Sequence, residues 1–147
     1  MLRVVAVLAA LAVGATAVLA QNAAGIAARK EAMKGFGGAF KEPSAMAKGD
    51  APFDLPKVQA SLKSIQDIAA KGKGLFGDDT KIGETDALPA AFENKADLFA
   101  RFDKMGAAAK AAADTIKDEA TLKAEWPKVG GNCGGCHKEY RKPPAKK

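Results

Sequence analysis

The stretch Cys133-Gly134-Gly135-Cys136-His137 constrains this chain more than any other. Two cysteines three residues apart, followed at once by a histidine, form the pattern for covalent attachment of a c-type haem. In such a site the thiols form thioethers with the porphyrin, and the histidine is the proximal ligand of the iron. The helical repeat places these three side chains on one face, toward one flat ligand. The motif uses all the cysteine and histidine in the chain, and it predicts one haem c.

Three other interpretations of the cysteine pair are weaker. A zinc site needs about four ligands, and the chain has no second pair of cysteine or histidine residues. A thioredoxin-like redox pair belongs near a βαβ pattern, and no convincing strand is present. A disulfide across one helical turn closes a very short loop and stabilises little. Haem attachment through Cys133 and Cys136, with His137 on the iron, is therefore the prediction.

The N-terminus has the pattern of a targeting segment. Arg3 gives a short positive region, an uncharged apolar run follows, and Val18-Leu19-Ala20 fits a small-residue cleavage site. We expect residues 1–20 to be a signal peptide and residues 21–147 to be the mature domain. The alternative is a membrane anchor, but the run is short for one. Export agrees with the motif, because haem of this type is usually attached outside the bacterial cytoplasm. We therefore expect a periplasmic protein that does not insert into the membrane after cleavage.

Charge and composition exclude some classes of function. The net charge is +6, with lysines spread along the chain and few aromatic residues. Nucleic-acid binding needs a basic patch with an element that reads bases, so we expect none. A modest positive charge suits docking to an acidic partner protein. We also expect no enzyme, because the chain has no second histidine and its carboxylates form no catalytic constellation.

The mature chain reads as four helices, which predicts an all-α fold. Alanine is abundant and apolar residues recur at spacings of three and four. We expect helices at 23–41, 55–71, 90–117 and 119–141, with a long connection over 75–88. Pro43 should end or kink the first helix, and Gly72 with Gly74 should end the second. Short loops between amphipathic helices predict an antiparallel up-down-up-down bundle.

The fourth helix carries the haem motif on its apolar side. Its apolar positions repeat by four and three: Leu122, Trp126, Val129, Cys133, Cys136 and Tyr140. A haem attached there lies inside the bundle, near the C-terminal end of the last helix. Four glycines also fall in this stretch, at 130, 131, 134 and 135, and each weakens a helix by about 1 kcal/mol relative to alanine. Either they leave room for the porphyrin, or the helix is frayed there.

This layout resembles the class II c-type cytochromes, meaning cytochrome c prime and its low-spin relatives. The resemblance covers essentially the whole mature chain. It rests on Arg29-x-x-x-Met33, on the turn Lys48-Gly49-Asp50-Ala51-Pro52-Phe53-Asp54, and on Val129-Gly130-x-x-Cys133-x-x-Cys136-His137-x-x-Tyr140-Arg141. A Cys-x-x-Cys-His motif at the end of the last helix is its most specific part.

The resemblance implies roles for three further residues. Met33 matches the position that faces the iron from the distal side, although a methionine on an apolar stripe often only packs. Met105 is a second candidate for this ligand. Arg29 matches an arginine often found near a haem propionate, and Arg141 matches one beside the proximal histidine. Each arginine could instead lie on a solvated helix face.

Two functions follow from the resemblance. If Met33 closes the sixth position, the iron is low-spin and the protein is an electron carrier with a redox partner protein. If the sixth position stays open, the haem is five-coordinate and high-spin, and it binds nitric oxide or carbon monoxide. The resemblance allows either a monomer or a homodimer paired through the first two helices.

Overall fold

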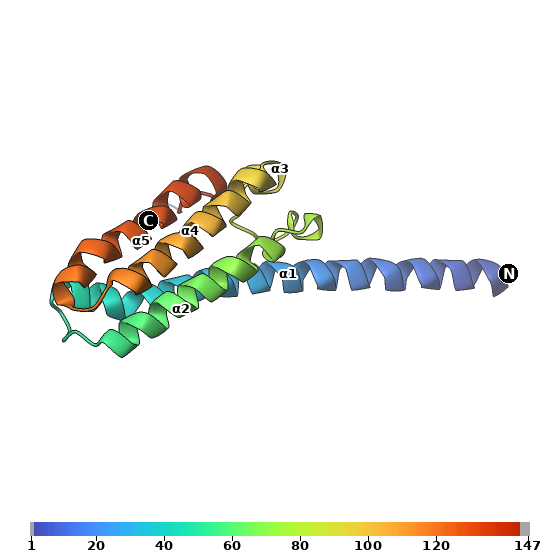
Figure 1. The fold of residues 1–147 in the computed structure, drawn as a ribbon. Helices are drawn as coiled ribbons and strands as arrows, with labels where there is room; N and C mark the ends of the chain where they lie inside the picture. Colours follow the sequence, from blue (N-terminus) through green and yellow to red (C-terminus); the bar gives the residue numbers. More distant parts are fainter. Residues whose placement is uncertain (1, 145–147) are drawn as a thin grey trace.

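The chain folds into a bundle of helices. The computed structural model describes the backbone of residues 2–144 and the side chains of residues 22–144. The helices are α1 (Leu2–Lys48), α2 (Leu55–Gly72), α3 (Ala90–Glu93), α4 (Lys95–Thr115) and α5 (Glu119–Tyr140), with short 3₁₀ turns η1 (Lys73–Leu75) and η2 (Asp78–Thr80) (Figure 1). Within the described residues, β pairing is confined to one isolated bridge between Ala87 and Arg141.

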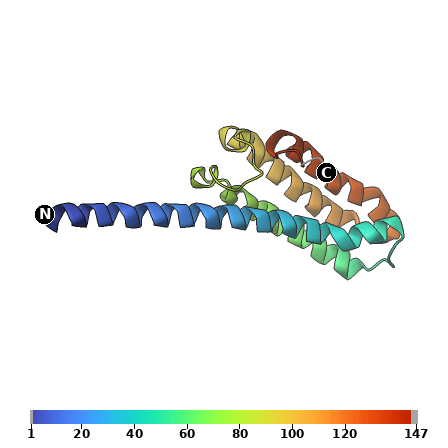
Figure 2. The same cartoon turned by 180° about the vertical axis from the view of Figure 1, so that it is seen from behind.

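The four long helices are antiparallel neighbours, which confirms the predicted up-down-up-down bundle. Helix α1 packs against α2 and α5, and α4 packs against the same two helices. Figures 1 and 2 show that the first half of α1 extends beyond the other helices. Across residues 22–144, whose side chains the structure describes, no helix combines the length and the apolar character that crossing a membrane requires.

The first helix is longer than its sequence predicts. We expected it over 23–41, with an end or a kink at Pro43, but α1 begins at Leu2 and continues through Pro43 to Lys48. Proline removes one helical hydrogen bond, and tertiary contacts stabilise the turn beyond it. Met46 is buried in the core, and the indole Nε1 of Trp126 donates a hydrogen bond to Ser44 Oγ over 2.9 Å.

The third predicted helix is interrupted. The expected range was 90–117, but Asn94 has non-helical torsion angles (φ −105°, ψ 47°) and separates α3 from α4. The break lets Phe92 turn inward, where its ring centroid lies 5.9 Å from that of Phe76. The C-terminal end also comes early, because Ile116 is extended and fully buried.

The starts of α2 and α5 agree with the sequence. Asp54 caps α2 by accepting a hydrogen bond from the backbone N–H of Lys57, and Asp118 caps α5 by accepting one from Thr121. The Thr121 hydroxyl accepts in return from the Asp118 N–H, which completes a capping box. These short polar caps fix where each helix begins.

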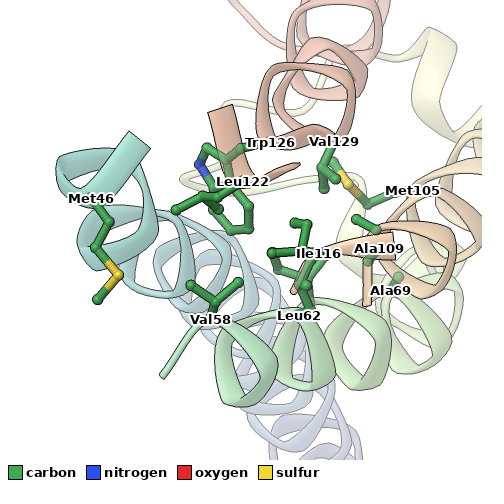
Figure 3. Close-up of a cluster of buried hydrophobic side chains, with 12 residues drawn as sticks. Met46, Val58, Leu62, Ala69, Met105, Ala109, Ile116, Leu122, Trp126 and Val129 are labelled. Atoms are coloured by element: carbon green, nitrogen blue, oxygen red, sulfur yellow. The ribbon is translucent and has the colours of Figure 1, made fainter. Parts of the chain in front are cut away.

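The core consists of two clusters along the bundle axis. The turn-end cluster lies beside the short connections at 49–54 and 116–118; it contains Met46, Val58, Leu62, Ile65, Ala69, Met105, Ala109, Ala112, Ile116, Leu122, Trp126 and Val129 (Figure 3). The strap-end cluster lies at the opposite end and contains Phe76, Ala91, Phe92, Leu98, Phe102 and Tyr140. We call residues 75–88, which connect α2 to α3, the strap.

Candidate haem site

The haem motif lies in the last two turns of α5. Cys133 and Cys136 are free thiols and both are partly buried. Cys133 packs against the turn-end cluster and Cys136 against the strap-end cluster. Burial raises the pKa of both thiols. The two sulfur atoms therefore face apolar protein from one side of one helix, as the repeat of apolar positions predicts.

His137 follows directly and is also partly buried. Desolvation, with a smaller contribution from the positive charge of Arg141, lowers the pKa of its imidazole. A neutral imidazole keeps a nitrogen lone pair free for a metal. Arg141 is exposed just past the helix, and its backbone N–H donates to the His137 carbonyl over 3.1 Å. The backbone of Arg141 thus lies one helical turn from His137, and a role for this arginine beside a bound haem stays a prediction.

Met33 comes to the same region from α1. It is partly buried and packs, together with Phe36, against the strap-end cluster that Cys136 also contacts. Met33 and Cys136 therefore pack against the same cluster, although one lies near the start of the expected mature chain and the other near its end.

Met105 has a different environment. It belongs to the turn-end cluster, is 7% exposed, and points from α4 toward Val129 of α5 (Figure 3). Cys133 contacts this cluster, but Cys136 contacts the other one. The two candidate methionines are therefore divided between the two clusters.

Arg29 is buried on α1, with 4% of its surface exposed. Its Nη1 donates to the carbonyl of Leu75 and the hydroxyl of Thr80, and its Nη2 donates to the Thr80 carbonyl and the Thr85 hydroxyl, over 2.7–3.0 Å. The guanidinium carbon also lies 5.1 Å from the centroid of the Phe76 ring. A solvated helix face does not describe this arginine. Contact with a haem propionate stays a prediction, and the four bonds leave its Nε–H as the remaining donor.

The glycines of α5 do not interrupt the helix, which is continuous from Glu119 to Tyr140. A Cβ atom added to Gly131 or Gly134 would meet no other atom within 4 Å, and one at Gly130 or Gly135 would make only ordinary contacts. Close packing of the protein does not require these glycines. The helix is therefore not frayed at residues 130–135.

A polar network next to the motif was missed by sequence reasoning. Arg101 on α4 donates from Nη1 to the Gly135 carbonyl over 2.9 Å and from Nε to Asp97 over 2.6 Å. The Tyr140 hydroxyl donates to the same Asp97 carboxylate, and it is the main reason that the pKa of Asp97 is lowered. Asp97 and Arg101 are four residues apart, so their pairing was foreseeable. Their contact with α5 depends on how the helices pack.

The residues present fit a c-type haem. Two free thiols and an imidazole whose pKa is lowered by burial lie on one helix, and apolar side chains of α1 and α4 pack in the same region. No group of three histidine, cysteine, aspartate or glutamate side chains within residues 22–144 could hold a metal ion, so a zinc site has no further ligands there. A helical bundle with this motif facing its interior defines a c-type haem protein.

Comparison with known proteins names the family. The family model described as Cytochrome C' matches residues 24–141. The chain therefore belongs to the cytochrome c' family, whose members bind covalently attached haem c. This finding confirms the family and the cofactor that the sequence pattern indicates.

Proteins named cytochrome c' and proteins named cytochrome c-556 both resemble the chain. A cytochrome c' of Rhodopseudomonas palustris is 49% identical over 117 residues, which are 79% of this chain and 80% of the relative. A solved structure of cytochrome c' from that species has a TM-score of 0.79 and 47% identity, over 82% of this chain and 98% of the solved one. A cytochrome c-556 of the same species is 32% identical over 146 residues, or 96% and 97% of the two chains.

A more distant solved structure was determined with a gas bound. It is the nitric oxide complex of a mutant of cytochrome c prime from Alcaligenes xylosoxidans. It has a TM-score of 0.72 and 26% identity, and the match covers 83% of this chain and 97% of that one.

Proposed function

We propose that Cys133 and Cys136 hold one haem c through thioether bonds and that His137 is the proximal ligand of its iron. The observation that carries this proposal is the set of two free thiols and the chain's one histidine on one partly buried face of α5. The bound haem supplies one-electron and gas-binding chemistry, and the protein determines access and potential.

Denaturing electrophoresis followed by haem staining tests this attachment. The haem should stay with the chain, because thioether bonds survive denaturation. Cys133→Ala combined with Cys136→Ala should lose the stain, whereas Ser44→Ala is a control that keeps both thiols. Haem that is extracted from the native chain by acid acetone would contradict covalent attachment.

We further propose that Met33 is the distal ligand and that the protein is an electron carrier. Met33 packs on the same cluster as Cys136, and Cys136 directly precedes His137, the proposed proximal ligand. A thioether sulfur is a soft ligand that occurs opposite histidine in other c-type haem proteins. In this proposal Arg29, one turn before Met33, and Arg141, one turn after His137, flank the haem. A closed sixth position leaves electron transfer to a redox partner protein as the function.

The ferric absorption spectrum tests the distal ligand. The wild-type protein should be low-spin, with the weak band of a sulfur–iron bond in the far red. Met33→Ala should become high-spin, and in the ferrous state it should bind carbon monoxide. Met105→Ala is the matched control and should keep the wild-type spectrum. A low-spin spectrum that persists in Met33→Ala but is lost in Met105→Ala would transfer the role to Met105.

A second candidate function is binding of nitric oxide or carbon monoxide at an open sixth position. The Alcaligenes relative, which was solved with nitric oxide bound, favours it. The side chains around Met33 support it as well, because the strap-end cluster is apolar apart from the Tyr140 hydroxyl and suits a neutral diatomic gas. A wild-type protein that is high-spin and binds carbon monoxide readily would select this function over electron transfer.

We also propose that residues 1–20 are a signal peptide and that the haem domain functions in the periplasm. The support is the sequence of the segment, with Arg3 before an uncharged run and Ala20 at the end of a small-residue site. The proposal includes no nucleic-acid partner and no catalytic residue. Sedimentation of the mature protein would distinguish a monomer from a homodimer.

A further inference from the structure

The strap is attached to the two helices that carry the proposed iron ligands. On one side it is bonded to Arg29, which lies one helical turn before Met33 on α1. On the other side it is hydrogen-bonded to Tyr140 and Lys142, three and five residues after His137 at the end of α5. Both attachments are polar and specific, and they join segments that are 46–57 residues apart in sequence.

The attachment to α1 is a buried arginine. The four hydrogen bonds of Arg29 go to three strap residues, namely Leu75, Thr80 and Thr85. Both threonines are buried, with 4% and 8% of their surface exposed. A buried guanidinium is stable only when its donors are satisfied. The strap therefore cannot leave α1 without exposing or stranding this charge.

The attachment to α5 is a short run of backbone bonds. The Leu88 N–H donates to the Tyr140 carbonyl over 2.9 Å, and the Lys142 N–H donates to the Asp86 carbonyl over 2.8 Å. The Lys142 ammonium donates to the Thr85 carbonyl over 2.7 Å. These bonds begin three residues after His137, so they hold the chain just beyond the proposed proximal ligand.

Thr85 is the residue where the two attachments meet. Its hydroxyl accepts hydrogen bonds from Arg29 Nη2 and from the Ala87 N–H, and its carbonyl accepts one from Lys142. One residue thus links a cation of α1 to a cation that follows α5. A movement of α1 away from α5 at this end must break bonds at Thr85.

We propose that Arg29, Thr85 and Lys142 are positioning residues that fix the separation of α1 and α5 at the strap end. This separation determines whether the Met33 sulfur reaches the haem iron and how easily a gas molecule enters beside it. The inference rests on the proposed haem attachment and deepens the proposed function. It gives Arg29 a role through the strap, in addition to its nearness to the haem.

Three variants of the mature holoprotein test the proposal: Thr85→Val, Arg29→Met and Lys142→Met. Thr85→Val removes only the hydroxyl. Lys142→Met removes one exposed ammonium and keeps every backbone bond, so this variant should fold even if the other two do not. The matched controls are Thr115→Val and Lys104→Met, which change exposed side chains of α4 for which no hydrogen bond to the strap is seen among the described residues.

The readouts are the carbon monoxide association rate of the ferrous protein, the ferric spin state and hydrogen exchange of the strap amides. Loss of one buried hydrogen bond should change the separation of α1 and α5 enough to raise the carbon monoxide association rate by about tenfold. The strap amides should exchange faster and the high-spin fraction should rise. The controls should match the wild-type protein in all three measurements.

A double-mutant cycle makes the test specific. If Arg29 and Lys142 act through Thr85, their effects on the logarithm of the association rate should be non-additive, whereas Arg29→Met and Lys104→Met should be additive. The proposal would be overturned by variants that have a lower melting temperature but the wild-type association rate and spin state. An additive cycle for Arg29→Met and Lys142→Met would also overturn it, because the strap would then be only structural.

The outcome is separate from that of the distal-ligand proposal. The wild-type spectrum by itself decides whether Met33 ligates. The ratio of variant to wild-type association rates tests the strap in either case, because release of α1 opens the distal side of a five-coordinate haem as well. A high-spin wild type whose association rate rises in the strap variants would therefore reject Met33 as ligand and support the positioning role.

Discussion

Gly72 is buried in the last turn of α2, next to the Phe102 ring of α4. A glycine at the end of an apolar stripe predicts a left-handed helix cap, but Gly72 is right-handed (φ −57°) and belongs to the last turn of α2. The space beside it is filled by Phe102, because an added Cβ atom would overlap that ring. The glycine is needed for close helix packing rather than for a turn.

We expect Gly72→Ala to destabilise the holoprotein by about 1–3 kcal/mol, because the Phe102 ring must leave its place in the core. Helix propensity alone predicts the opposite sign, a gain of up to about 1 kcal/mol. Urea unfolding followed by far-ultraviolet circular dichroism measures the difference. Gly74→Ala is the matched control, because its Cβ atom would meet nothing within 4 Å. Equal stability of Gly72→Ala and the wild type would show that the ring moves without cost.

The difference between local spacing and packing between helices also separates the site residues that the sequence predicts from those that it does not. Cys133, Cys136 and His137 are recognised from sequence because their chemistry depends on spacing within one helical turn. The bonds of Arg29 to Thr80 and Thr85 depend instead on where the strap lies in space. Spacing along one helix contains no information about partners that are distant in sequence.

At the scale of elements, the starts of α2 and α5 were easier to predict than the end of α1 and the break before α4. Asp54 and Asp118 are N-caps that act through local hydrogen bonds, and α2 and α5 begin where the sequence predicts. The end of α1 and the break at Asn94 depend on the burial of Met46 and Phe92 against other helices. Propensity rules therefore misplace these ends by up to seven residues, from 41 to Lys48 at the end of α1.

The cap of α5 should make stability depend on pH. Hydrogen bonds from the backbone N–H and then the hydroxyl of Thr121 hold the pKa of Asp118 below its usual range. A carboxyl whose pKa is lowered by folding stabilises the protein above its unfolded pKa of about 4, and this contribution is lost as the pH falls through the folded value. Asparagine caps a helix without titrating in this range.

We therefore expect the wild type to lose stability relative to Asp118→Asn as the pH is lowered from about 5 to about 3. At neutral pH the order should favour the wild type, because a negative charge at a helix N-terminus is stabilising. Urea midpoints at several pH values measure both effects. Parallel curves for the two proteins across the acid range would contradict the role assigned to the carboxylate.

At the scale of the whole molecule, the arrangement of four helices followed from pattern. Apolar positions at spacings of three and four give each helix one apolar face. With short connections, four such helices have few other arrangements that bury all four apolar faces. The division of the core into two clusters was not foreseen, because it depends on which side chains meet at each level of the bundle. The long N-terminal part of α1 was also not foreseen, since residues 1–20 were expected to be a separate leader.

We expect the exported protein to have the mass of residues 21–147 plus one haem. Figures 1 and 2 show that the part of α1 before this point extends beyond the other helices, so its removal leaves the bundle complete. Asn22, which donates from its side chain to the Ile82 carbonyl of the strap, stays in the mature chain. Mass spectrometry of protein from the periplasmic fraction measures this. A mass that includes residues 1–20, with the protein found in the membrane fraction, would identify an anchor instead.

The two-cluster core has a consequence for how the protein matures. The turn-end cluster draws on α1, α2, α4 and α5 and is complete without Met33, Cys136 or the strap. It can therefore form while the strap end is still open, and the thiol of Cys136 then remains accessible to the enzymes that attach haem. Attachment would be followed by closure of the strap across Arg29 and Lys142. Hydrogen exchange of the cysteine-free apoprotein should show protected amides around Leu62 and Leu122 and unprotected ones in the strap; uniform protection would mean that the chain closes before the cofactor arrives.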